Sequence, residues 1–114
     1  MVTKHITVAA ATGTWVVRAG GAVIAESTNA LELFEGDYAP VVYFPRDDVA
    51  MAFLDASEKT STCPHKGEAV HFHIEGKSGR IEDAAWSYEA PKEDVARISG
   101  HIAFYANKVT VEAL

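Results

Sequence analysis

Turn signals recur about every ten residues along this chain, and this spacing is what most restricts its fold. They stand at Thr12-Gly13, Gly20-Gly21, Gly36-Asp37, Gly76 to Gly79, Pro91, Gly100 and Asn107. Segments of this length suit short strands and leave little room for helices of ordinary length. The sequence therefore predicts a mainly β fold.

Apolar and β-branched residues between the turns mark the predicted strands. We expect a hairpin between Val16 and Glu26, because Gly20-Gly21 can adopt the positive φ values that suit a tight turn. Further strand candidates are Leu31 to Glu35, Val41 to Phe44, His101 to Tyr105 and Lys108 to Leu114.

A second hairpin is indicated by strict alternation of side chains. Val70, Phe72 and Ile74 alternate with Ala69, His71 and His73, and Lys77-Ser78-Gly79 then turns the chain into Arg80 to Glu89. Successive side chains of a strand point to opposite faces. One face is therefore predicted to be core, and the other to hold the two histidines.

Helix is expected in only two short places. Pro45 at a first-turn position, with Asp47 and Asp48 following, suits a helix start, and Val49 to Leu54 would be its apolar part. A second short turn is predicted at Glu93 to Ile98, ahead of Gly100 as a terminator.

Composition excludes several classes of protein. A chain of 114 residues that is 48% hydrophobic suits one globular domain over residues 1–114 and excludes a disordered or fibrous chain. The formal net charge of −6 removes the broad basic surface that a non-specific nucleic-acid or anionic-membrane binder needs. The segment from Met1 to Ala11 is interrupted by Lys4 and His5, and no run reaches the ~18 apolar residues of a membrane span. We expect a soluble cytoplasmic protein.

The densest group of reactive residues is Thr62-Cys63-Pro64-His65-Lys66-Gly67. The single cysteine excludes an internal disulfide, but a thiol beside a cation could form an activated thiolate. Lys66 and Gly67 could instead bind an anion, since glycine lets it approach the backbone and lysine neutralises it. A plain turn with a small buried thiol is the simpler interpretation, and these alternatives stay open.

A metal site is a further alternative. His71 and His73 would project from one strand face and could chelate zinc with Cys63 and His65. The spacing matches no standard zinc finger, and a half-exposed strand face with ordinary histidines explains it better. We therefore assign no metal ligand from the sequence.

Three other segments offer binding or catalytic side chains. Tyr43-Phe44-Pro45-Arg46-Asp47-Asp48 would place charged groups at the rim of the sheet, where a buried Asp48 could act as an acid or base. Trp86 and Tyr88 would share a strand face and form an aromatic wall for a planar ligand. His101 and Tyr105 would share another face and look into a cavity or into water.

Taken together, these motifs resemble domain-of-unknown-function family 427, small bacterial and fungal proteins sometimes labelled nucleotidyltransferase-like. The matching segments are Trp15 to Arg18, Val23 to Ser27, Pro40 to Val49, Thr62 to Ala69, Ala84 to Tyr88 and His101 to Tyr105. The resemblance implies a small barrel or a tent-like pair of sheets, with one or two short helices. We further expect Tyr43 to Asp48 and Cys63 to Gly67 to lie close together and to line one pocket with Trp86 and Tyr88.

Two classes of function follow. In the first, a small-molecule binding module, Lys66 and Arg46 pair with an anionic group, and Trp86 and Tyr43 stack on an apolar or planar part. Asp48 orients the cationic side chain or a ligand hydroxyl.

In the second, an enzyme of transferase or hydrolase type, Cys63 or a bound water attacks, Asp48 or His101 moves protons, and Lys66 stabilises negative charge. A binding function requires fewer specifically placed residues than catalysis, so we rank it first. The sequence leaves the question of a cofactor open, and pairing of edge strands into a homodimer also stays open.

Overall fold

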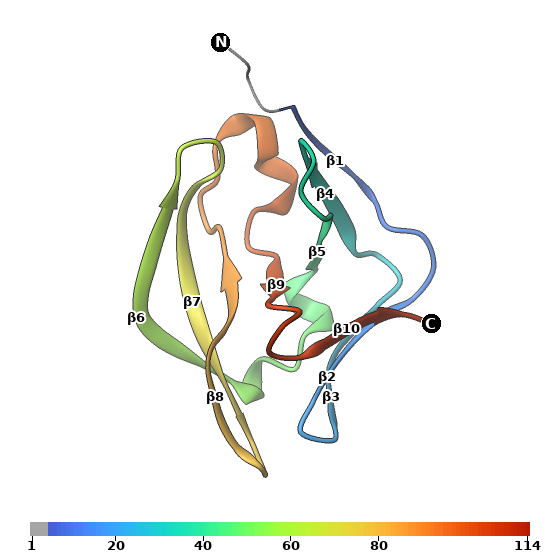
Figure 1. The fold of residues 1–114 in the computed structure, drawn as a ribbon, viewed down its shortest axis with the longest axis vertical. Helices are drawn as coiled ribbons and strands as arrows, with labels where there is room; N and C mark the ends of the chain where they lie inside the picture. Colours follow the sequence, from blue (N-terminus) through green and yellow to red (C-terminus); the bar gives the residue numbers. More distant parts are fainter. Residues whose placement is uncertain (1–4) are drawn as a thin grey trace.

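The computed structural model describes residues 5–114 as a mainly β protein (Figure 1). Three short 3₁₀ segments interrupt the strands: η1 (Arg46–Asp48), η2 (Met51–Phe53) and η3 (Glu93–Ile98). The strands are β1 (Ile6–Ala10), β2 (Trp15–Ala19), β3 (Ala22–Ser27), β4 (Leu31–Glu35), β5 (Val41–Phe44), β6 (Leu54–Cys63), β7 (Gly67–Gly76), β8 (Gly79–Ser87), β9 (Ile102–Phe104) and β10 (Thr110–Ala113).

The strands form two antiparallel sheets. The larger has seven strands in the order β1-β4-β5-β9-β8-β7-β6, and the smaller has three in the order β10-β2-β3. Figure 1 shows the large sheet bent into two arms, one of β6 to β8 and one of β1, β4 and β5, with β9 between them and η3 near one end of the gap. The sheet does not close into a barrel, so the two-sheet alternative is the one observed.

Two apolar cores lie on opposite faces of the large sheet. The first joins it to the small sheet, through residues such as Val17 and Ile24 on one side and Phe44 on the other. The second holds Tyr43 and Ala103 together with Val95 and Ile98 of η3. Because side chains alternate along a strand, neighbours on β5 and β9 enter different cores. The central strands are therefore buried on both faces.

Both predicted hairpins are confirmed. Gly20 and Gly21 adopt positive φ values of 55° and 81° in the turn between β2 and β3. The expected half-exposed histidine face is wrong for His71, however, because this residue is only 2% exposed. The second core covers this face of β7. The alternation of apolar and polar residues along a strand does not show whether its polar face will also be buried.

The predicted helix after Pro45 is replaced by two separate turns, η1 and η2. Val49 lies between them in an extended conformation and forms a β-bridge with Ala25. The backbone N–H of Ala50 donates to the carbonyl of Ile24 at 2.8 Å. Pairing with β3 therefore stops a continuous helix, whereas η3 lies at its predicted position ahead of Gly100.

Two strands were not predicted. β6 contains the polar stretch from Ser57 to Ser61, and it forms one edge of the large sheet, where polar side chains are common. β1 forms the opposite edge, and the first four residues of the segment that we interpreted as lacking a secretory signal lie outside the described residues. Within residues 5–114 there is no helix long and apolar enough to cross a membrane.

Candidate functional site

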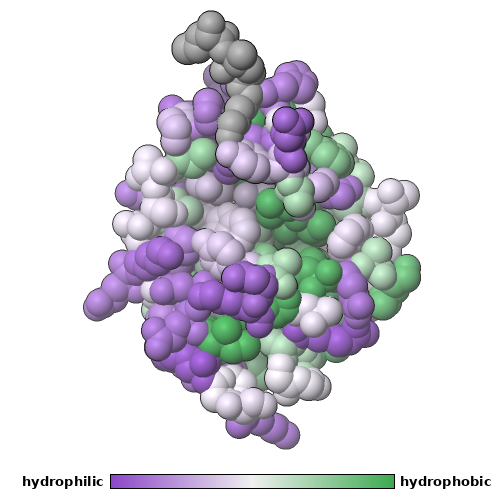
Figure 2. All heavy atoms as spheres, in the orientation of Figure 1, coloured by the Kyte–Doolittle hydropathy of each residue, from purple (hydrophilic) through white to green (hydrophobic). Residues whose placement is uncertain are grey.

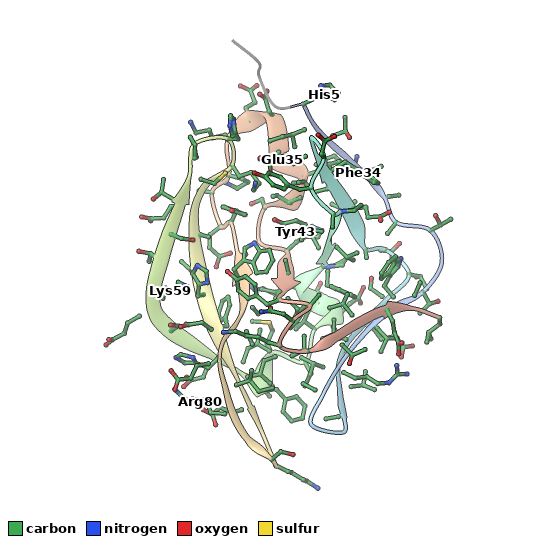
Figure 3. All side chains as sticks on the ribbon, viewed as in Figure 1. His5, Phe34, Glu35, Tyr43, Lys59 and Arg80 are labelled. Atoms are coloured by element: carbon green, nitrogen blue, oxygen red, sulfur yellow. The ribbon has the colours of Figure 1, made fainter. Side chains whose placement is uncertain are left out.

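A cavity of about 210 Å³ opens between the two arms of the large sheet. One wall comes from β4 and β5, and the other from β6, β7, β8 and the turn between β6 and β7. Figure 3 shows Tyr43 between the arms, whereas Lys59 and Arg80 lie on their outer side. The cavity is lined by Leu33, Glu35, Tyr38, Ala39, Val41, Tyr43, Ser61, Lys66, His71, Trp86, Tyr88 and Tyr105.

Aromatic side chains make up much of this lining, and they contact one another. Trp86 packs edge-on against Tyr43, with ring centroids 6.2 Å apart, and lies 4.4 Å from the ring of Tyr105. The indole N–H of Trp86 donates to the hydroxyl of Tyr43 at 3.3 Å. Burial raises the pKa of Tyr43, Tyr88 and Tyr105, so the three phenols are neutral at pH 7 and keep an O–H donor.

An ion pair joins the two arms at this cavity. Lys66 Nζ lies 2.7 Å from Glu35 Oε1, and the two side chains are only 11% and 13% exposed. Burial is the largest single influence and opposes the charge on Lys66, but the hydrogen bond to Glu35 and the nearby acidic groups together outweigh it, so the pKa of Lys66 lies above its ordinary value. The ammonium group stays charged at pH 7 and has further N–H donors beyond the one that Glu35 accepts.

The turn between β6 and β7 positions Lys66. The N–H of Lys66 donates to the carbonyl of Cys63 at 3.2 Å, and its own carbonyl accepts from the N–H of Lys92 at 2.9 Å. Gly67 follows with φ of +114°, a value that residues with a Cβ rarely adopt. This glycine therefore serves the turn that aims Lys66 into the cavity, rather than contacting the cavity itself.

A serine of β6 and a histidine of β7 form a polar pair in the same wall as Lys66. Ser61 Oγ lies 2.9 Å from His71 Nε2, whereas His71 Nδ1 is buried with no hydrogen-bond partner in the described chain. The His71 ring stacks on Tyr105 at an interplanar angle of 10°. Burial is the main cause that lowers the pKa of His71, so the imidazole is neutral at pH 7.

A second hollow of about 400 Å³ adjoins the first and is more apolar. The two share Ala39, Val41, Trp86 and Tyr105, and the second extends to Trp15 of β2 and Val111 of β10. Figure 2 shows pale and green residues gathered in the middle of one face of the molecule, with hydrophilic residues around them.

The structure brings four of the nine predicted site residues together in this cavity: Tyr43, Lys66, Trp86 and Tyr88. Cys63 packs against the second core beside them without lining the cavity. Gly67 does not line the cavity, and its contribution is the backbone conformation of the β6–β7 turn that holds Lys66.

Arg46, Asp48 and His101 lie elsewhere. Arg46 binds both carboxylate oxygens of Glu89, at 3.0 and 3.2 Å, and Asp48 accepts a hydrogen bond of 2.6 Å from the hydroxyl of Ser27. His101 lines a separate depression together with Arg46. Each of these side chains has a structural partner within the protein.

The zinc site considered as an alternative in the sequence analysis has no geometric support in the described chain. Residues 5–114 contain no cluster of three or more histidine, cysteine or acidic side chains that could hold a metal ion. His71 points its Nε2 at Ser61, and His73 Nδ1 accepts the backbone N–H of Asp83 at 3.0 Å.

The sequence did not single out Glu35, Ser61 or His71 for the roles that they have here. Glu35 is the last residue of a strand, and no local pattern indicates its partner 31 positions away. Ser61 lies in a strand that was not predicted. The alternation along β7 did place His71 on one face, and it is the signal that could have pointed to this histidine.

Fold and cavity together define a small all-β protein of two packed antiparallel sheets, with an aromatic cavity in the bend of the larger sheet. The chain belongs to the family described as Domain of unknown function (DUF427) and labelled NTP_transf_9, whose model matches residues 7–113. The resemblance inferred from the sequence motifs is thereby confirmed. A search of curated proteins finds no match to the chain.

Proposed function

We propose that this protein binds a small molecule with a planar ring and one acidic group in the cavity between the two arms. The observation that supports the proposal most directly is the combination of an aromatic lining with one charged lysine. Binding sites for small ligands are usually apolar and aromatic, with a few polar groups that fix orientation. Trp86 and Tyr43 suit the ring, and Lys66 suits the acidic group.

The pairing of Lys66 with Glu35 limits the charge of the ligand that we expect. The pair is nearly neutral, so it does not attract polyanions strongly, but the ammonium group has donors left for one carboxylate oxygen. Arg46 forms a two-pronged ion pair with Glu89 outside the cavity. We therefore expect a ligand with a single acidic group rather than several phosphates.

The size of the site favours a ligand of one or two rings. A volume of about 210 Å³ suits a single substituted ring, and the adjoining hollow of about 400 Å³ leaves room for an apolar extension past Trp86. The enzyme alternative built on Cys63 and Asp48 has less support, because neither side chain lines the cavity.

The test is a binding screen with aromatic carboxylates and their neutral amides, followed by Trp fluorescence and ligand-observed NMR. Lys66→Met is expected to weaken carboxylate binding about tenfold, since a charge-assisted hydrogen bond is lost, and to spare the amides. Trp86→Leu is expected to weaken both sets.

Arg46→Met is the matched control, because it removes a cation that lies outside the cavity. It should leave both sets unchanged. Binding that is absent throughout the panel, or that is insensitive to Trp86→Leu, would contradict the proposal.

A further inference from the structure

We propose that Ser61 and His71 form a nucleophile–base pair that transfers the acyl group of a carboxylic ester or thioester to water. The proposal rests on the proposed binding site, because both side chains line the same cavity as Lys66 and Trp86. The ring that binds against Trp86 would belong to the acyl part or to the leaving group of the ester.

The sheet register holds the two side chains in place. Ser61 of β6 pairs with Ala69 of β7, and His71 follows two residues later on the same face of β7. Diagonal neighbours of this kind lie within reach of each other across antiparallel strands. The result is a distance of 2.9 Å between Ser61 Oγ and His71 Nε2, which lies in the range required between a nucleophile and its base.

The two residues differ in exposure as a nucleophile and a base should. Ser61 is exposed on an edge strand, so a substrate can reach its hydroxyl from the cavity. His71 is 2% exposed and stacked on Tyr105, which fixes its ring. A buried histidine is neutral at pH 7 and can accept a proton.

The unpaired Nδ1 of His71 is the second observation. A buried polar atom without a partner is costly, and a histidine with a purely structural role would be expected to satisfy both of its nitrogens. For Nε2 to accept from the Ser61 hydroxyl, the proton of the neutral ring must sit on Nδ1. In that tautomer the unpaired atom is an N–H, and Nε2 stays directed at Ser61.

The reaction balances with water as the second substrate. The Ser61 Oγ–acyl carbon bond forms while the hydroxyl proton moves to His71 Nε2, and the bond to the leaving alcohol or thiol then breaks as that proton is delivered to it. Water repeats the sequence through His71 and releases the acid, restoring Ser61. Lys66 supplies positive charge in the same cavity, the sign that a developing oxyanion needs.

An alkyl fluorophosphonate tests the first step alone, because the Oγ–phosphorus bond forms as fluoride leaves. We expect one adduct at Ser61, forming at least about 100-fold faster than at the exposed Ser78, which lies in the β7–β8 turn. The comparison is made within the native protein by peptide mass mapping. Labelling of Ser61 no faster than of Ser78 would overturn the proposal.

Variants then separate the two roles. Ser61→Ala should abolish the adduct, whereas Ser57→Ala should retain it, because Ser57 lies on the same strand but donates to Asp83 instead of a histidine. His71→Gln should slow labelling about 100-fold if Nε2 is the base. An unchanged rate in folded His71→Gln would also overturn the proposal.

The outcomes distinguish this inference from the proposed binding function. If Ser61 stays unlabelled while aromatic carboxylates still bind in a Trp86-dependent manner, acyl transfer is excluded and binding stands. If Ser61 is labelled and the unlabelled protein hydrolyses 4-nitrophenyl benzoate, but no aromatic carboxylate binds, acyl transfer stands and the proposed ligand class fails.

Discussion

Phe44 shows how strongly a single side chain supports this fold. It is fully buried in the first core, where its ring lies 5.9 Å from that of Phe104. Phe44→Ala is expected to lower the free energy of unfolding by about 3–5 kcal/mol, because it removes buried apolar surface and leaves a cavity. Urea denaturation measures the loss.

Phe34→Ala is the matched control. The same substitution at this 38% exposed phenylalanine of β4 should cost roughly 1 kcal/mol. Equal losses at the two positions would show that the first core does not depend on Phe44 as inferred here.

His71 makes stability depend on pH in a predictable direction. Burial and the positive charges of Lys59 and Lys108 lower its pKa below the ordinary 6.5, with Asp83 opposing. The unfolded chain therefore binds more protons between the two pKa values, and stability falls as pH decreases through this window. Above about pH 6.5 the histidine is neutral in both the folded and the unfolded chain, and the folded protein has the full stability that it loses at lower pH.

The measurement compares native protein with His71→Gln in urea at about pH 7.5 and about pH 5. Carboxylates titrate in both proteins, so their contribution cancels in the difference. The difference in unfolding free energy should shrink toward the lower pH. A difference that stays constant with pH would contradict the assignment of the shift to His71.

The β6–β7 turn depends on the backbone conformation of one glycine. A Cβ at Gly67 would lie 3.5 Å from the carbonyl oxygen of Ala90, so space is sufficient, but φ of +114° is strained for any other residue. Gly67→Ala is therefore expected to cost about 1–3 kcal/mol and to displace Lys66 from Glu35.

Gly76 provides the comparison at the other end of β7. It has no positive φ, and a Cβ there would meet nothing closer than 3.9 Å. Gly76→Ala should change stability by less than about 1 kcal/mol in either direction. Thermal unfolding of both variants gives the comparison, and a Gly67→Ala protein as stable as Gly76→Ala would show that the turn tolerates a side chain.

Elements differed in how far local sequence predicted them. The strands β4 and β5 follow from their apolar residues, and the β2–β3 hairpin follows from its two glycines. β6 could not be found in this way, because an edge strand exposed on one side needs little apolar patterning. The segment after Pro45 has helix signals, yet pairing of Val49 with Ala25 overrides them.

The charge of the whole molecule yields a prediction about partners. A chain with 16 acidic and 10 basic side chains has no net attraction for a polyanion, and its central cation, Lys66, is paired with Glu35. We expect no change in the fluorescence anisotropy of a short labelled DNA duplex at micromolar protein and near-physiological salt. Non-specific DNA binders show dissociation constants of roughly 10⁻⁴ to 10⁻⁶ M under these conditions, so saturable binding in that range would contradict the expectation.

Sequence alone determined the class of fold and part of the site. Turn spacing and alternation along short segments are local properties, and they were sufficient to predict a mainly β protein and its two hairpins, although β8 ends at Ser87 and Tyr88 lies just beyond it. Six motifs spread along the chain, those around Tyr43 and Lys66 among them, were sufficient together to identify the family. Both residues do line the cavity.

Only the tertiary structure decided which of these residues meet. The bend in the large sheet brings Glu35 to Lys66 across 31 residues and gives the face of His71 a cover, while Arg46 and Asp48 turn to partners outside the cavity. Such contacts depend on strand order and sheet curvature, which are set by the packing of many side chains at once. No local sequence pattern contains that information, because each contact joins segments that are far apart in the chain.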